Sequence, residues 1–260
     1  MEFGAKGPGD NFVQGDTSSA LAVAAGFHDL RERRCDVAIV GGYDSLLTVS
    51  TFLAYDKAGL LSALPPARAY RPFDCGRDGI VLGEGAAFLL LERAEDAERR
   101  RANVLGEILG TADAAEPEDA LDGKASDGAL RSAVEAATGG APVDFVVAHG
   151  IGTKKADRDE ARVLEAVVGR TVPVAAFKSQ TGYLGAATAA VELVLALQAA
   201  REGVVPFIAR LERVDDGCPV AVVAGAPRRL TAERPTALCL ASSLFGHWSA
   251  TAVRAGSPQA

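Results

Sequence analysis

Two glycine-rich segments in the second half of the chain carry side chains that can donate or accept protons. His149 follows an apolar run and opens the segment His149-Gly150-Ile151-Gly152-Thr153. Lys178 opens the second segment, and Tyr183 stands five residues later. An imidazole titrates near neutral pH, and a phenol keeps its proton until about pH 10. A histidine that closes a buried strand can be a satisfied core residue, but the glycine-rich surroundings of His149 favour a functional site.

A third candidate position is the start of a helix expected at residues 16–34. Its acidic start and its basic end suit the helix dipole. Thr17 becomes a nucleophile only if a positioned base takes the proton of its hydroxyl group, and the carboxylate of Asp16 is a weak nucleophile. The ordinary role of Asp16 or Thr17 at this place is that of a helix N-cap.

The elements that must position these side chains alternate between strand and helix. Strands are expected at 36–42, 80–92, 104–111, 144–148, 172–177, 235–242 and 249–254, and helices at 16–34, 125–137, 157–168 and 185–202. This order is typical of an α/β protein with a largely parallel sheet. The run Val37–Val40 is wholly apolar, which predicts a strand buried on both faces. The acidic stretch 113–123 is expected to be a solvated loop.

Composition excludes several classes of function. The 260 residues, 48% of them hydrophobic and 23% charged, indicate a globular protein with a sizeable core. The net charge of −7 argues against nucleic acid or an anionic membrane as a partner. No apolar run is long enough to span a bilayer and no signal core begins the chain, so we expect a cytoplasmic protein. Its four cysteines are expected to be free thiols. With three histidines, no metal is expected, and no cofactor either.

Five segments in the same order resemble the β-ketoacyl synthase family. They are the histidine segment, the lysine segment, Asp36–Asp44 with its paired glycines, Arg71-Pro72-Phe73-Asp74 through Gly83-Glu84-Gly85-Ala86, and Ser242–Val253. This family condenses acyl chains carried on acyl carrier proteins in fatty-acid and polyketide synthesis. The resemblance covers nearly the whole chain.

The resemblance implies a thiolase-like fold with α-β-α-β-α layers. Residues 103–260 would form a complete C-terminal half, and residues 1–102 a partial N-terminal half that begins near the nucleophile helix. The strand at Val37–Val40 would then lack neighbours, and an apolar strand with an unpaired edge tends to associate. We therefore expect the missing strands to come from another polypeptide or from a longer chain, unless the protein is a decayed remnant.

The family's nucleophile is a cysteine at the start of a buried helix, and this chain has no thiol there. One alignment of Ser19-Ala20-Leu21 with the family motif places Thr17 at the nucleophile position. A shift by one residue places Asp16 there instead. Both alignments remain open from the sequence. A thiol exchanges acyl groups with a carrier thioester far more readily than a hydroxyl or carboxyl group does.

The resemblance also assigns roles to the other candidate residues. His149 matches the histidine that donates a hydrogen bond to the thioester oxygen of the malonyl unit. Tyr183 stands at the second histidine position, although it can instead pack against the helix expected from Gly185. Lys178 and Glu160 match a pair that orders the loop. Phe245 matches the gating phenylalanine, in a closing loop where Ser243-Leu244 and His247-Trp248 replace glycine-rich positions.

These departures predict a ketosynthase-like protein of fatty-acid or polyketide biosynthesis that does not condense. The family contains such proteins, the chain-length factors, which pair with an active ketosynthase that works with an acyl carrier protein. A second hypothesis is an acyltransferase in which His149 activates Thr17 towards acyl thioesters. A third is a truncated ketosynthase without a function of its own.

Overall fold

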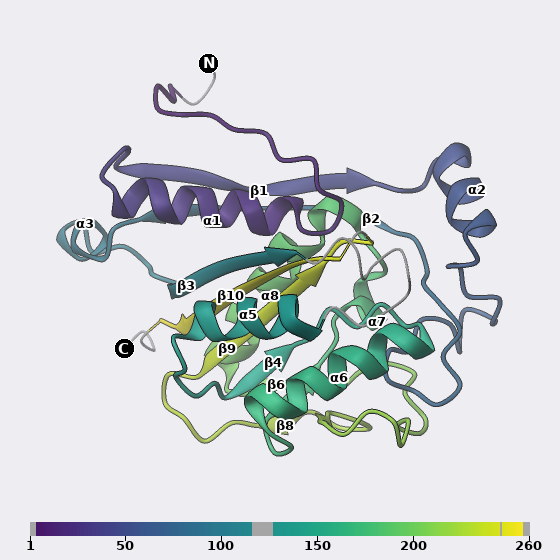
Figure 1. The fold of residues 1–260 in the computed structure, drawn as a ribbon. Helices are drawn as coiled ribbons and strands as arrows, with labels where there is room; N and C mark the ends of the chain where they lie inside the picture. The colour runs from purple at the N-terminus through teal and green to yellow at the C-terminus, as the bar shows by residue number, and fades with distance from the viewer. Residues whose placement is uncertain (1–3, 116–126, 245, 257–260) are drawn as a thin grey trace.

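A six-stranded mixed sheet forms the centre of the molecule (Figure 1). The computed structural model of the chain describes residues 4–115, 127–244 and 246–256. In spatial order the strands are β3 (Gly106–Ala115), β10 (His247–Ala255), β9 (Thr236–Ser242), β4 (Phe145–Val147), β5 (Pro173–Ala175) and β7 (Ala221–Val222). The strands β9, β4, β5 and β7 are parallel, whereas β10 is antiparallel to both β9 and β3. The sheet is therefore parallel on one side and antiparallel on the other.

The end of β3 differs from the sequence-based expectation. The acidic stretch from Asp113 was expected to be a loop, but residues 113–115 continue β3 and pair with residues 247–249 of β10. Ala112 and Ala114 pack against the main core, so the alternation of small apolar and polar residues fits a strand with one buried face. The remainder of the predicted loop, residues 116–123, lies outside the described residues.

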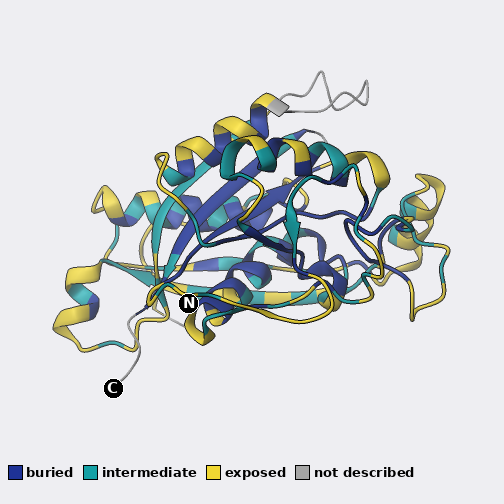
Figure 2. Ribbon diagram, turned by 90° about the horizontal axis from the view of Figure 1, so that it is seen from below, coloured by how far each residue is buried: buried dark blue, intermediate teal, exposed yellow. Residues whose placement is uncertain are grey.

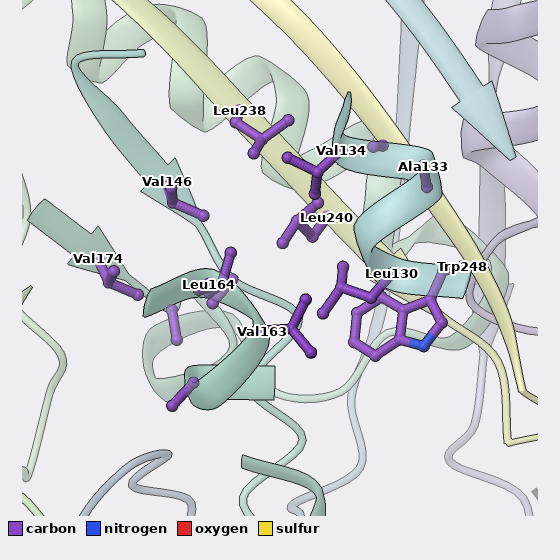
Figure 3. Packing of buried hydrophobic residues seen from close by; sticks show 14 of the residues in the cluster. Leu130, Ala133, Val134, Val146, Val163, Leu164, Val174, Leu238, Leu240 and Trp248 are labelled. Carbon is purple, nitrogen blue, oxygen red and sulfur yellow. The ribbon is translucent and has the colours of Figure 1, made fainter. Parts of the chain in front are cut away.

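Helices cover both faces of the central sheet. The helices α5 (Asp127–Thr138) and α6 (Lys154–Val168) cover one face, where they enclose Val146, Val174 and Leu238 (Figure 3). The helix α8 (Thr188–Glu202) covers the other face and meets Phe145 and Val147. Successive residues of β4 thus point into different cores, and all three are buried, as expected of a parallel strand inside an α/β protein. Figure 2 shows the same pattern, with buried strands between helices that are exposed on their outer sides.

A second, two-stranded sheet lies on the far side of α1 (Ser18–Arg31) (Figure 1). It pairs β1 (Val37–Ser45) with β2 (Glu84–Glu92) in antiparallel register. The prediction that β1 is buried on both faces is wrong for this chain. Val40 is buried against α1, but Val37 and Ile39 are 50% and 55% exposed. The cause is that the described residues cover only the inner face of this sheet.

The layers thus follow one another as helix, sheet, helix and sheet. They are α5 with α6, the central sheet, α1 with α8, and finally β1 with β2. Within the described ranges, no outer helical layer covers β1 and β2, since their outward side chains are exposed. The remaining elements are α2 (Val49–Lys57), α3 (Ala94–Arg99), α7 (Lys178–Thr181), the 3-10 turn η1 (Gly185–Ala187), β6 (Val204–Val205) and β8 (Arg228–Arg229). None of the helices in the described ranges is long and apolar enough to cross a membrane.

The loop between α2 and β2 is anchored by a fully buried arginine. Arg77 Nε lies 2.9 Å from Asp157 Oδ2 and Arg77 Nη1 lies 2.8 Å from Asp215 Oδ2. The same Asp157 carboxylate accepts the backbone N–H groups of Phe73 and Gly152. This network ties the loop to the start of α6 and so holds the segment that follows His149.

Candidate functional site

Asp16, His149 and Tyr183 come together from three distant parts of the chain. Asp16 precedes α1, His149 follows β4, and Tyr183 lies between α7 and η1. Asp16 Oδ2 lies 3.9 Å from His149 Nε2, and the hydroxyl group of Tyr183 lies close enough to the Asp16 carboxyl group to shift its pKa. All three are almost wholly buried, at 2%, 4% and 1% exposure. The structure therefore brings one carboxyl group, one imidazole and one phenol into a single polar cluster.

His149 presents a proton to this cluster. Its Nδ1 atom accepts the backbone N–H of Ser242 at 3.3 Å, so the ring proton of the neutral imidazole is on Nε2, the atom nearest Asp16. Burial, followed by the charge of Lys178, lowers the pKa of His149 well below its usual value. His149 is therefore a neutral hydrogen-bond donor rather than a cation at physiological pH.

The carboxyl group of Asp16 holds its proton more tightly than an ordinary aspartate does. Burial raises the pKa of Asp16 to about 7, and the nearby hydroxyl group of Tyr183 and the charge of Lys178 only partly oppose this rise. The charges of Glu192 and Asp44 raise the pKa further. Its Oδ2 atom has no hydrogen-bond partner in the described part of the chain. Both protonation states of Asp16 are consequently accessible near neutral pH.

Thr17 faces away from this cluster. Its hydroxyl group donates to the carbonyl oxygen of Gln14 at 3.0 Å and lies 3.0 Å from Nδ1 of His247. The expected pairing of Thr17 with His149 is therefore absent, because Asp16 occupies the side that faces His149. The N-cap prediction is confirmed for the position, since Thr17 is the N-cap residue of α1, but the Thr17 side chain makes no capping hydrogen bond.

Tyr183 packs among loops rather than against the helix that follows it. Its ring meets that of Tyr55 at 5.7 Å in an edge-to-face arrangement, and it shares a small core with Tyr70, Ile80 and Ile151. Burial and the neighbouring charge of Asp16 raise the pKa of Tyr183. Its phenol therefore stays protonated and acts as a hydrogen-bond donor.

Lys178 and Glu160 do not form the predicted ion pair. Lys178 Nζ lies 3.0 Å from both carboxylate oxygens of Glu192 on α8. Glu160 instead accepts the backbone N–H groups of His149 at 2.7 Å and Gly150 at 2.8 Å. Glu160 thus positions the histidine segment, and Glu192 neutralises the lysine. The sequence signal for Glu192 was its place as a lone carboxylate in the first half of an otherwise apolar helix.

The closing loop is described only in part. The predicted gate residue Phe245 lies outside the described residues. Leu244 is 46% exposed, whereas Trp248 is buried and meets the ring of His149 edge-to-face at 6.0 Å. Within the described ranges no group of three or more His, Cys, Asp or Glu side chains is placed to hold a metal ion.

Family models match both halves of the chain. The N-terminal domain of β-ketoacyl synthases matches residues 1–97, and the C-terminal domain matches residues 102–212. The chain belongs to the β-ketoacyl synthase family. Solved ketosynthases share its thiolase-like layered fold. The complex AntDE:AntF, a type II polyketide synthase acyl carrier protein with its ketosynthase, gives a TM-score of 0.88 at 25% identity over 98% of this chain. The ishigamide ketosynthase/chain length factor gives 0.83 at 26% over 95%.

Curated relatives of this ketosynthase-family chain include proteins of polyketide synthesis. The tetracenomycin polyketide synthase ketoacyl synthase alpha subunit of Streptomyces glaucescens is 33% identical over 98% of this chain. Nodulation protein E of Rhizobium meliloti is 32% identical over 88% of it. The chain spans 61% and 57% of the length of these two relatives, and 65% and 60% of the two solved chains.

Proposed function

We propose that this chain is a ketosynthase-like protein of polyketide biosynthesis that does not condense and serves as a partner subunit of an active ketosynthase. The observation that carries this proposal is the identity of the side chain that faces His149. It is the carboxyl group of Asp16, and all four cysteines are free thiols in other parts of the chain. Asp16 is therefore our candidate for the nucleophile position.

A carboxyl group at this position does not support acyl loading. Transfer of an acyl group from a thioester to a carboxylate would give a mixed anhydride, which is more reactive than the thioester it came from. The burial of Asp16 adds a second obstacle, since it favours the protonated, non-nucleophilic form. The presence of Lys178 and Glu160 is then explained by their roles in holding the fold of the site.

The outer face of the small sheet supports the proposed partnership. Five large apolar side chains on this face are 50–76% exposed: Val37, Ile39, Tyr43, Phe88 and Leu90. A contiguous apolar face of this kind marks an association surface. We propose that it is covered by polypeptide of the ketosynthase family, either the partner subunit or an upstream part of the same protein. The proposed system also includes an acyl carrier protein.

Acyl loading tests the proposed function. Wild-type protein incubated with an acyl-acyl carrier protein is expected to keep its mass. The variant Asp16→Cys is expected to gain the mass of one acyl group, because its thiol would face His149. The matched variant Thr17→Cys is expected to stay unmodified, because that side chain points away from the cluster of Asp16, His149 and Tyr183. Elongation of a primed chain with malonyl units by the wild-type protein, without another synthase, would overturn the proposal.

One observation keeps an acyltransferase as a second candidate. The hydroxyl of Thr17 and Nδ1 of His247 are 3.0 Å apart, which is within reach for a nucleophile and its base. In this version His247 replaces His149 as the base. An acyl adduct on the wild-type protein that is lost in Thr17→Ala would establish the acyltransferase.

A further inference from the structure

The unpartnered oxygen of Asp16 points to a ligand that the proposed partner role does not use. Asp16 is 2% exposed, and its Oδ2 atom accepts no hydrogen bond from the described residues. A buried acceptor without a partner is costly and rare in native proteins, and it is often found at catalytic sites. A ligand that supplies a proton at this point would offset that cost.

A hydrogen-bond donor lies beside this oxygen. Nε2 of His149 is 3.9 Å from Asp16 Oδ2, too far for a direct hydrogen bond. Standard bond lengths put a carbonyl oxygen about 2.4 Å from the α-carbon next to it. A ligand can therefore place its carbonyl oxygen about 2.8 Å from Nε2 and its α-carbon about 3.2 Å from Oδ2 at the same time. The distance of 3.9 Å between Nε2 and Oδ2 is compatible with both contacts. The two groups thus match one carbonyl group and the C–H bond beside it.

We propose that Asp16 is a general base that removes the α-proton of a β-ketoacyl thioester, with His149 as hydrogen-bond donor to the enolate oxygen. The α C–H bond breaks and its proton moves to Oδ2. The electron pair moves onto the carbonyl oxygen, which accepts the Nε2–H of His149. Return of the proton reverses the step, so no oxidant, reductant or second substrate is needed. This inference rests on the proposed function, because it assumes that the site meets β-ketoacyl chains.

The chemistry of the site selects the β-keto class. An α-carbon between two carbonyl groups is far more acidic than that of a simple acyl thioester, since both carbonyl groups share the negative charge. Burial also makes Asp16 a stronger base than an ordinary carboxylate. The other titratable groups that interact with Asp16 are the phenols of Tyr183, Tyr55 and Tyr70, the ammonium group of Lys178, and the carboxyl groups of Glu192 and Asp44. A carboxyl base beside neutral donors is an established arrangement for proton abstraction next to a carbonyl group.

The ring of Tyr55 separates the site from the solvent-exposed part of the helix α2. Tyr183 is covered by Tyr55 of α2, and none of the residues of α2 is buried. An element with so little burial separates from the protein at low cost. We therefore assign the α2 side as the entry for the acyl group.

Loss of deuterium from a labelled probe tests this inference. The probe is the N-acetylcysteamine thioester of 2-methyl-3-oxopentanoic acid with deuterium at C2, and washout is followed by mass spectrometry. Wild-type protein is expected to raise the washout rate at least tenfold above buffer, with a rate that increases through about pH 7 as Asp16 ionises. Asp16→Asn is expected to return the rate to that of buffer, and His149→Ala to lower it at least tenfold.

Controls separate this outcome from unfolding and from failure of the proposed function. The control variant Asp159→Asn is expected to keep the wild-type rate. Asp159 lies on α6, where its carboxylate pairs with Lys155 and Arg162. Circular dichroism confirms that each variant is folded. If the protein purifies only with its partner, a partner-only sample gives the background. Equal rates for wild type and Asp16→Asn would overturn the inference, whereas the proposed partner role is judged separately by acyl loading.

Discussion

At the scale of the residue, Asp16 places a carboxyl group where burial disfavours its charge. Its pKa is about 7 in the folded chain, against 3.8 for an aspartate side chain in water, so the folded state holds the proton more tightly than the unfolded state. The contribution of Asp16 to stability therefore falls as the pH rises from about 4 to about 7 and is constant above that range. Asp16→Asn removes this dependence.

Asp16→Asn is thus expected to stabilise the protein at pH 8, and not at pH 4. The gain in the free energy of unfolding should be about 2–4 kcal/mol. Urea denaturation at the two pH values measures it. Glu160 and Asp157, whose pKa values burial raises to about 7 and about 6, are present in both proteins and cancel in the comparison. The same gain in Asp159→Asn, or none in Asp16→Asn, would contradict this account.

At the scale of the element, the ion pair between Lys178 and Glu192 joins α7 to α8. Both side chains are buried, at 0% and 2% exposure. Removing one partner of such a pair leaves an uncompensated charge in the interior. The pair also keeps a positive charge near Asp16 and His149, where it affects both pKa values.

Glu192→Gln is expected to destabilise the protein by about 3–5 kcal/mol, because the Lys178 charge is then unpaired. Thermal or urea unfolding measures the loss. The double variant Lys178→Met with Glu192→Gln should recover much of it, because no buried charge remains. A single variant as stable as wild type would mean that water reaches Lys178.

At the scale of the whole molecule, the four layers leave one apolar face open. Ile39 and Leu90 are directly opposite each other in the small sheet and are 55% and 59% exposed. Together with their neighbours, these two residues make the outer face apolar on both strands. The inner face of the sheet packs on α1 and α8. A two-stranded sheet alone is marginally stable, and packing on one face is what holds it here.

Charging the open face separates folding from association. The double variant Ile39→Lys with Leu90→Glu is expected to change the free energy of unfolding by less than about 0.5 kcal/mol, since both side chains are exposed. Its affinity for the ketosynthase partner should fall by about 30-fold or more, as for a hot spot at an interface. Val40→Ala, on the inner face, is the contrasting variant and should lower stability instead. Unchanged affinity, measured by calorimetry, would place the partner elsewhere.

The sequence by itself determined the family, the two site segments and five of the six central strands; the short edge strand β7 was not predicted. Strands such as Phe145–Val147, and the helices that follow them, can be predicted from the local periodicity of apolar residues. His149 can be placed at the end of a buried strand in the same way. The absence of a thiol at the start of α1 was also evident. These conclusions depend only on residue types that lie close together in the sequence. For that reason they agree with the structure.

Only the tertiary structure decided which side chains meet. It turned Asp16 rather than Thr17 towards His149, gave Lys178 the carboxylate of Glu192 rather than Glu160, and left the outer side of β1 exposed. Side chains of neighbouring residues at the start of a helix point in directions about 100° apart. The sequence left open whether Asp16 or Thr17 occupies the nucleophile position, and in the structure Asp16 faces His149 whereas Thr17 faces His247. Contacts between segments more than 100 residues apart depend on how the layers pack, which local periodicity does not specify.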